Sequence, residues 1–451
     1  VQFGGQTPLN LAVPLRKAGV PILGTSAEHI DIAEDRKRFK EMLHKLGLFQ
    51  PESDTVFTFQ EAQVAADRLG YPVLVRPSYV LGGRAMEIVY EKNTLEKFIH
   101  EAAKVSGEHP ILIDKFLEDA LEVDVDLIDD GHTYVIGGIM EHIEEAGIHS
   151  GDSAMSLPTA SLSGAILAKI REATYKMAQE LSIKGLMNVQ FAVKDDTVYV
   201  IEVNPRASRT VPFVSKAIGV PLASLATKVM LGKSLRDLGF TKEIVPKYVS
   251  IKESVFPFSR FPGVDIILGP EMKSTGEVMG IDSDFGGAFL KSQLAAGQKL
   301  PTKGNVFLSV RDKDKNAILS IAQKLLGLGF RLYATSGTAG ILQKGKFAVT
   351  VLPKISEGRP NILDFMKDGK IQLVINTPSG RIPRQDEVKI RSLVVLYGIA
   401  YTTTMSGAQA TVNAIESLVR KGITVNSVQE YHAGKASPVK SRRGKQQKKK
   451  T

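Results

Sequence analysis

A short acidic turn, Asp195-Asp196-Thr197, separates two runs of strand-forming residues and predicts a β-hairpin. Side chains alternate between the faces of a strand, so Glu202 and Asn204 share one face. If the three turn residues form the loop, Gln190 lies opposite Glu202 and joins that face. One carboxylate and two amide oxygens then lie together, and this donor set suits Mg²⁺, or Mn²⁺ in its place. A hairpin with an ordinary polar face is the alternative.

Arginines occur next to two of the predicted turns. Arg206 and Arg209 directly follow the hairpin, where they would stabilise the negative charge on a transferring phosphoryl group. Arg76 and Arg84 lie on either side of Gly82-Gly83, whose backbone N–H groups can approach phosphate oxygens closely. The pattern predicts a phosphate-binding loop, with a plain β-turn as the alternative.

Two further segments carry polar groups suited to a nucleotide. An apolar hinge at Phe116 and Leu117 offers backbone groups to a flat base, and Glu122 can accept ribose hydroxyls. His142 and His149 lack the spacing of a helical zinc pair, so we expect His149 to donate a hydrogen bond to phosphate or substrate. The alternatives are a two-sided strand for the first segment and a solvent loop for the second.

Composition limits the class of protein. The 451 residues suggest about three domains. The absence of cysteine excludes disulfides, thiolate metal sites and cysteine nucleophiles. Residues 435–451 hold eight of the basic residues and no acid, so the net charge of +10 falls to about +2 without them. We expect a disordered basic tail, no nucleic-acid partner, no membrane span and a cytoplasmic location.

The order of predicted elements indicates α/β units. Residues 1–8 resemble a strand end, a glycine turn and a helix start, followed by helix 9–17, strand 20–23 and a charged helix over 31–46. A start inside a strand suggests a fragment, or a sheet that a partner completes. After a boundary near 299–304, strands and helices alternate, which favours a parallel, doubly wound sheet. Its predicted strands are 305–310, 331–335, 347–352, 371–376 and 392–397, and its helices 313–328 and 407–420.

Four motifs carry a family resemblance. They are R-P-S-Y-V-L-G-G-R-A-M-E (76–87), G-I-H-S-G-D-S (147–153), G-L-M-N-V-Q-F-A-V (185–193) and I-E-V-N-P-R-A-S-R-T-V-P-F (201–213). The chain resembles the ATP-grasp enzymes and, more narrowly, the carboxy-terminal half of the carbamoyl-phosphate synthetase large subunit, up to about residue 432.

The resemblance implies a mixed α/β and α+β fold with a defined domain order. The expected parts are a partial pre-ATP-grasp α/β unit (1–35), an ATP-grasp domain (36–231), the remainder of the synthetase body (232–300), a doubly wound, methylglyoxal-synthase-like allosteric domain (301–434) and the basic tail (435–451).

The resemblance also implies site residues. The expected ATP contacts are Arg76, Lys115, Leu117, Glu122, Gly147, Ile148, His149, Ser150, Gln190 and Glu202. The family pattern agrees with metal ligation by Gln190, Glu202 and Asn204. A turn between strand and helix, beginning at Thr335, is a good anion site. The expected effector residues are Thr335, Thr338, Lys354 and Asn376 with the 376–381 loop, and an ornithine site matches Glu144, Asp152, Glu253, Tyr401 and Thr403.

The implied activity is ATP-dependent phosphorylation of carbamate to carbamoyl phosphate, feeding arginine and pyrimidine biosynthesis. The implied partners are an amino-terminal synthetase half, a glutaminase small subunit, a nucleotide monophosphate effector and further copies in an oligomer. A chain without cysteine cannot take ammonia from glutamine by a cysteine nucleophile. The alternatives are another ATP-grasp carboxylate ligase, such as a biotin-carboxylase-like enzyme, and a non-catalytic regulatory subunit that binds effectors.

Overall fold

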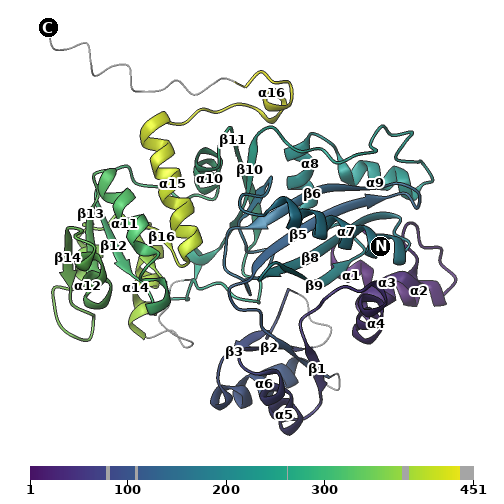
Figure 1. Ribbon diagram of the computed structural model, residues 1–451, viewed down its shortest axis with the longest axis horizontal. Helices are drawn as coiled ribbons and strands as arrows, with labels where there is room; N and C mark the ends of the chain where they lie inside the picture. Colours follow the sequence, from purple (N-terminus) through teal and green to yellow (C-terminus); the bar gives the residue numbers. More distant parts are fainter. Residues whose placement is uncertain (78–81, 107–109, 262, 378–384, 437–451) are drawn as a thin grey trace. The chain divides into compact units, whose positions relative to one another are not determined.

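Figure 1 shows the computed structural model of the chain, which describes residues 1–77, 82–106, 110–261, 263–377 and 385–436. The chain forms two compact units. Unit 1 comprises Val1–Lys247 and Gly269–Met272, and unit 2 comprises the remaining residues. The predicted basic tail lies outside the described residues from 437 onward, as do 78–81 of the glycine loop and 378–381 of the effector loop.

Unit 1 begins with four helices, α1 (Gln6–Leu9), α2 (Ala12–Lys17), α3 (Ala27–Glu34) and α4 (Arg36–Leu46). The expected strands at 1–3 and 20–23 are wrong, because these residues form none. A strand must pair its backbone groups with a neighbour, and no described strand pairs with either segment. The expected helix over 31–46 is interrupted at Asp35, whose carboxylate accepts a hydrogen bond from the Arg38 N–H (2.9 Å) and so begins α4.

A small antiparallel sheet follows, in the order β1-β4-β2-β3. Its strands are β1 (Ser53–Val56), β2 (Val73–Pro77), β3 (Glu87–Val89) and β4 (Ile111–Lys115). Helices α5 (Phe59–Leu69) and α6 (Lys92–Ser106) bury alanine, leucine and isoleucine side chains against it. This sheet carries the Arg76 end of the predicted phosphate loop.

The larger sheet of unit 1 has the antiparallel order β7-β6-β5-β8-β9. Its strands are β5 (Leu121–Asp129), β6 (Tyr134–His142), β7 (Met155–Leu157), β8 (Gly185–Lys194) and β9 (Thr197–Asn204). Helix α7 (Gly164–Glu180) and α4 pack on it over a continuous apolar core. Helices α8 (Val211–Ile218) and α9 (Leu222–Met230) follow β9 and pack against β5, β6 and β8.

The β8–β9 hairpin confirms the predicted pairing of Gln190 with Glu202, but its turn is shorter than predicted and a bulge restores the register. The turn contains only Asp195 and Asp196, both in the left-handed region (φ 49° and 59°), and Thr197 already pairs with β8. Aspartate tolerates this conformation, which matches the twist of a two-residue hairpin. A bulge at the step from Phe191 to Gln190 then shifts the register by one residue, which restores the expected pairing.

Unit 2 contains an antiparallel pair, β10 (Val249–Val255) and β11 (Gly276–Asp282), with α10 (Phe285–Ala295). Its five-stranded sheet is parallel throughout and has the order β14-β13-β12-β15-β16. The strands are β12 (Asn305–Ser309), β13 (Arg331–Thr335), β14 (Val349–Leu352), β15 (Leu373–Asn376) and β16 (Ala400–Thr402). This confirms the predicted doubly wound, parallel sheet.

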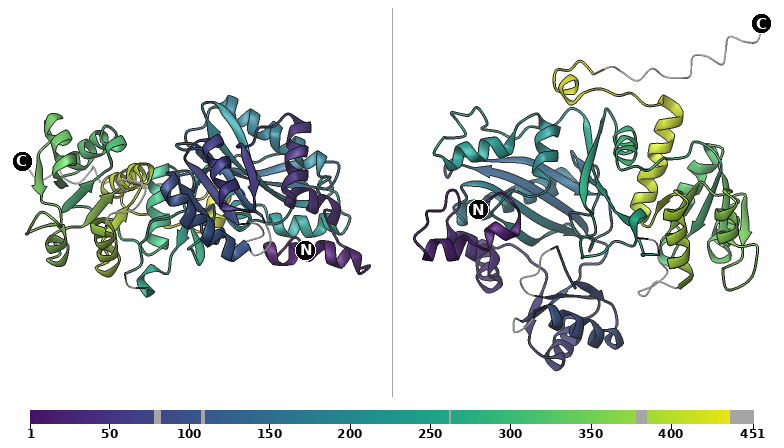
Figure 2. Two further views of the ribbon diagram at one scale, coloured as in Figure 1. Left: turned by 90° about the horizontal axis from the view of Figure 1, so that it is seen from below. Right: turned by 180° about the vertical axis from the view of Figure 1, so that it is seen from behind.

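Helices flank this sheet (Figure 2). They are α11 (Ile318–Gly327), α12 (Ser336–Lys344), α13 (Ile362–Lys367), α14 (Gln385–Leu396) and α15 (Met405–Lys421). Helix α16 (Val428–His432) follows α15 and does not belong to this set. The predicted strand 392–397 is wrong, because most of it belongs to α14. A short apolar run fits either structure, and burial of Ile390 and Val394, four residues apart, reveals the helical spacing.

No single helix in the described part of the chain is long and apolar enough to cross a membrane, although the bent pair α8 and α9 meets the length and composition requirements together.

Candidate active site

Two adjoining cavities in unit 1, of about 520 and 640 Å³, lie against the β8–β9 hairpin and the small sheet. They share Arg76, Glu122 and Gly147 as lining residues. All ten residues predicted to contact ATP line one cavity or both, with Lys115 and Leu117 in the larger. The structure therefore brings together residues from five separate segments of the chain, while their contact with ATP stays a prediction.

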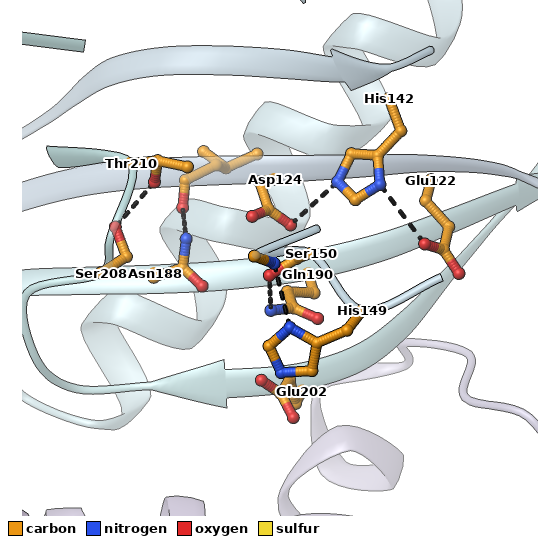
Figure 3. Close-up of polar contacts among 12 residues, drawn as sticks. Glu122, Asp124, His142, His149, Ser150, Asn188, Gln190, Glu202, Ser208 and Thr210 are labelled. Atoms are coloured by element: carbon orange, nitrogen blue, oxygen red, sulfur yellow. Dashed lines mark hydrogen bonds and ion pairs between the residues drawn. The ribbon is translucent and has the colours of Figure 1, made fainter. Parts of the chain in front are cut away.

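The three predicted metal ligands line the smaller cavity. The Asn204 amide donates to Glu202 Oε1 (2.8 Å), and the Gln190 amide donates to Ser150 Oγ (3.1 Å). Figure 3 shows Gln190, Glu202 and His149, which all line this cavity. A single carboxylate with amide oxygens fits a hard divalent cation that takes its other ligands from phosphates and water. No group of three or more His, Asp or Glu side chains among the described residues forms a metal site by itself.

The two predicted catalytic arginines differ in their placement. Arg206 lines the smaller cavity and donates to Asn204 Oδ1 (3.0 Å) and Gln6 Oε1 (3.3 Å). Arg209 is exposed, with Nη1 2.8 Å from the sulfur of Met272, and does not line that cavity. Arg206 is thus held at the candidate metal face, and Arg209 lies outside the cavity wall.

Residues of the amino-terminal helices complete the smaller cavity, and the sequence motifs did not indicate them. Gln6 donates to Glu34 Oε2 (2.6 Å) and accepts from Arg206. Burial, with a contribution from the charge of Glu202, raises the pKa of Glu34. Burial, with the nearby charge of Arg76, lowers the pKa of Arg36 to about 10. The charged Glu-Asp-Arg run at 34–36 was the available signal, but charged runs usually face solvent.

The larger cavity contains the predicted nucleotide-binding groups. Arg76 pairs with Asp114 (2.6 Å), and the Lys115 ammonium donates to the Gly70 carbonyl (2.8 Å). Glu122 accepts a hydrogen bond from the Gly147 N–H (2.9 Å). Gly147 has φ +88°, and a Cβ there would lie 2.8 Å from the Phe116 ring, so only glycine fits.

His142 is buried and lies between the carboxylates of Glu122 and Asp124 (Figure 3). Its ring nitrogens are each 3.4 Å from a carboxylate oxygen, Nδ1 from Glu122 and Nε2 from Asp124. Burial by itself would lower the pKa of His142, but the two carboxylates outweigh it and raise the pKa from 6.5 to about 9. The raised pKa favours the imidazolium form of His142 at neutral pH, next to the buried Asp124 and the partly buried Glu122.

This arrangement predicts a pH-dependent contribution to stability. A histidine whose folded pKa is raised stabilises the fold fully below the unfolded value and loses this contribution as pH rises through the folded value. The difference in melting temperature between wild type and His142→Gln should therefore narrow as pH increases from about 6.5 to about 9.5. Thermal unfolding across this range tests it, with the exposed His100→Gln as control. A constant or widening difference would contradict the assignment.

The predicted effector residues lie at the carboxyl ends of the parallel strands in unit 2. Thr335 Oγ1 lies 3.4 Å from Ser309 Oγ, and the Asn376 amide donates to the Ser309 carbonyl (3.1 Å). Lys354 is exposed and follows β14. Thr338 is 1% exposed and accepts from the Val310 N–H (3.2 Å), so its hydroxyl supports the loop. Ligands of such sheets bind at these strand ends, beside the strand where the order reverses.

The proposed ornithine site stays a prediction, with Glu144 and Asp152 in unit 1 and the other three residues in unit 2. Sequence reasoning did not name Lys315, a further cation close to the predicted effector residues. The Nζ of Lys315 lies 3.4 Å from where a Cβ on Gly337 would be, in the first turn of α12.

Comparisons with known proteins agree with this geometry. Residues 35–238 match the family model described as the carbamoyl-phosphate synthase L chain ATP-binding domain, and residues 317–403 match the MGS-like domain. The carbamoyl phosphate synthase large chain, C-terminal section, of Methanocaldococcus jannaschii is 55% identical and aligns over 96% of this chain and 72% of that protein. This chain belongs to the carbamoyl phosphate synthase large-chain family.

Other members of the family differ in length. The C-terminal section from Aquifex aeolicus is 53% identical over 84% of its length, whereas the large chain of Archaeoglobus fulgidus is 58% identical over only 40% of its length. The chain thus spans about two fifths of such large chains. A solved biotin carboxylase complex from Campylobacter jejuni has a TM-score of 0.52 at 18% identity, covering 64% of this chain and 71% of that one. That likeness supports the ATP-grasp fold alone.

Proposed function

We propose that this chain phosphorylates carbamate with ATP and forms carbamoyl phosphate and ADP. One observation carries the proposal: the β8–β9 hairpin presents Gln190, Glu202 and Asn204 to a cavity that Arg206 also lines. Relatives that are named carbamoyl phosphate synthase large chain, C-terminal section, support the choice of substrate.

The reaction needs no protein nucleophile. An oxygen of carbamate attacks the γ-phosphorus, the bond from that phosphorus to the bridging oxygen breaks, and its electron pair leaves on ADP. Positioning and charge neutralisation are the main catalytic contributions in such transfers. Arg206, held by Asn204 and Gln6, stabilises the transferring group from the cavity wall. We assign Arg209 the same task from the loop that follows β9.

The nucleotide occupies both cavities in this proposal. The backbone at Phe116 and Leu117 binds the base, Glu122 accepts the ribose hydroxyls, and Arg76 neutralises phosphate charge. Gln190, Glu202 and Asn204 fit Mg²⁺, or Mn²⁺ in its place, which when bound supplies positive charge to the phosphates. His149 donates to phosphate or substrate at the same face; burial, its largest influence, lowers its pKa.

The proposal extends to partners and location. An amino-terminal synthetase section supplies carbamate, and a glutaminase subunit supplies ammonia. The names of relatives as C-terminal sections support the first of these partners. A nucleotide monophosphate, and ornithine, act as effectors on an oligomeric enzyme in the cytoplasm, which serves arginine and pyrimidine biosynthesis.

The decisive experiment is ATP formation from ADP and carbamoyl phosphate by the purified chain with Mg²⁺. This reverse reaction requires neither partner. A regulatory subunit without catalysis would form no ATP. Replacing carbamoyl phosphate by acetyl phosphate tests whether the phosphoryl donor is recognised specifically.

A further prediction concerns the nitrogen source. Glutamine amidotransferases attack the side-chain amide with a cysteine thiolate, and this chain contains no cysteine. We expect no glutamate when the purified chain receives glutamine, bicarbonate and MgATP, as measured by amino-acid analysis. Glutamate release at the rate of a true glutaminase would refute this expectation, and a glutaminase added in trans is the positive control.

A further inference from the structure

Asp126, on β5, is a buried carboxylate that does not line either cavity of the candidate active site. It is 1% exposed and accepts three hydrogen bonds. The donors are Asn188 Nδ2 (3.0 Å), Ser208 Oγ (2.7 Å) and Thr210 Oγ1 (2.6 Å). Burying a carboxylate is unfavourable unless such donors satisfy it. Because loss of any of these donors would leave the buried carboxylate with one partner fewer, the hydrogen bonds restrain all three side chains.

Two local irregularities accompany these hydrogen bonds. The pairing of β5 with β6 has a bulge at the step from Asp126 to Leu127, and bulges often turn a side chain toward a site. Thr210 stands at the N-cap of α8, where a threonine oxygen usually accepts a bond from the first turn. It makes no such bond here, and its hydroxyl bonds to Asp126 instead. At both places the chain departs from the regular strand or helix pattern, and the side chains of Asp126 and Thr210 bond to each other.

The cluster includes Ser208, which belongs to the segment that carries both predicted catalytic arginines. We call residues 205–209 the arginine loop. Ser208 and Thr210 immediately flank Arg209, and their hydroxyls lie 2.7 Å apart beside Asn188 (Figure 3). Arg206 also has side-chain partners of its own in Asn204 and Gln6. Arg209 differs from Arg206, because its two neighbours in the chain, Ser208 and Thr210, both donate hydrogen bonds from their hydroxyls to Asp126.

We propose that Asp126 is a positioning residue, which acts through Ser208 and Thr210 to hold Arg209 in place for phosphoryl transfer. The proposal rests on the proposed function for the role of Arg209. A displacement of about 1 Å can lower a catalytic rate by about 10²-fold. Loss of the anchor should therefore affect turnover much more than nucleotide binding.

The test compares Asp126→Asn and Ser208→Ala with wild type in ATP formation from ADP and carbamoyl phosphate. We expect kcat to fall about 10- to 100-fold in Asp126→Asn and less in Ser208→Ala, with KM for ADP changed by less than about twofold. The matched control is Asp129→Asn, another buried aspartate on β5, whose carboxylate accepts from the Gly131 N–H (2.7 Å). It should leave kcat within about twofold of wild type.

A double-mutant cycle separates positioning from general stability. If Asp126 acts through Arg209, adding Asp126→Asn to Arg209→Ala should lower kcat by no more than about twofold. Losses that multiply in the double variant would overturn the proposal, and so would wild-type kcat in both Ser208→Ala and a folded Asp126→Asn. Ser208→Ala keeps the cycle readable if Asp126→Asn does not fold, because Ser208 is only partly buried.

A measurement without turnover distinguishes this proposal from the proposed function. Phenylglyoxal labelling of Arg209, followed by peptide mass spectrometry, reports how the arginine loop is held. Faster labelling in Ser208→Ala and Asp126→Asn, but not in Asp129→Asn, supports the anchor. Equal labelling in all four proteins overturns it. A wild-type chain that forms no ATP would refute the proposed function, while the labelling result would still decide whether the anchor exists.

Discussion

Replacing Glu202 by alanine should lower the rate of ATP formation from ADP and carbamoyl phosphate by about 10²–10³-fold. Glu202 is the one carboxylate among the three predicted metal ligands, and it lines the smaller cavity on the polar face of the hairpin. Its loss removes the charge that holds a divalent cation against the phosphates. Initial rates at saturating Mg²⁺ measure the effect.

The matched control for Glu202→Ala lies on the same hairpin. Asp196→Asn also removes a carboxylate, and asparagine tolerates the left-handed conformation at this turn (φ 59°). The control should retain the wild-type rate and melting temperature. Near-normal ATP formation by Glu202→Ala would show that the hairpin face is not the metal site. A lowered melting temperature, with normal kcat for the fraction that stays folded, would indicate a structural role for Glu202.

The second large effect concerns regulation. Lys354→Ala and Thr335→Ala should weaken the response to a nucleoside monophosphate about tenfold or more while sparing the rate without effector. Both residues lie at the carboxyl end of the parallel sheet, where we expect an anion to bind at the start of α12 and at the exposed ammonium of Lys354. Titration of a purine and a pyrimidine nucleoside monophosphate, monitored by ATP formation, measures the response.

Lys370→Ala is the control for the effector variants. It removes the same charge from an exposed lysine before the amino end of β15, at the opposite edge of the sheet. The control should titrate as wild type does. A lost basal rate with an unchanged effector response in Lys354→Ala would contradict the separation of catalysis and regulation between the two units.

Local patterns in the sequence predicted the elements in which neighbouring residues decide the structure. Alternation placed Glu202 and Asn204 on one face, and alternating strands and helices predicted the parallel sheet of unit 2. The apolar run 392–397 was assigned wrongly, because its pattern fits a strand as well as a helix. Only the packing of Ile390 and Val394 into the core distinguishes them.

Distant contacts decided the rest of the site. Motifs named the hairpin residues and the segments around Arg76, Glu122 and Gly147, but not Gln6 or Glu34, which reach the cavity from another part of the chain. Neither residue belongs to a recognisable motif, and only their contacts in the folded chain place them at the cavity.

The amino-acid sequence by itself determined which strand faces are polar and to which family the motifs belong, and it predicted which turns bind anions. The tertiary structure alone decided the bulge that aligns Gln190 with Glu202, the burial of Asp126 among Asn188, Ser208 and Thr210, and the raised pKa of His142. The physical reason is the distance along the chain over which each interaction acts. Periodicity and turn preferences arise within a few residues, whereas register shifts, buried charges and their partners depend on segments far apart in the chain that folding brings together.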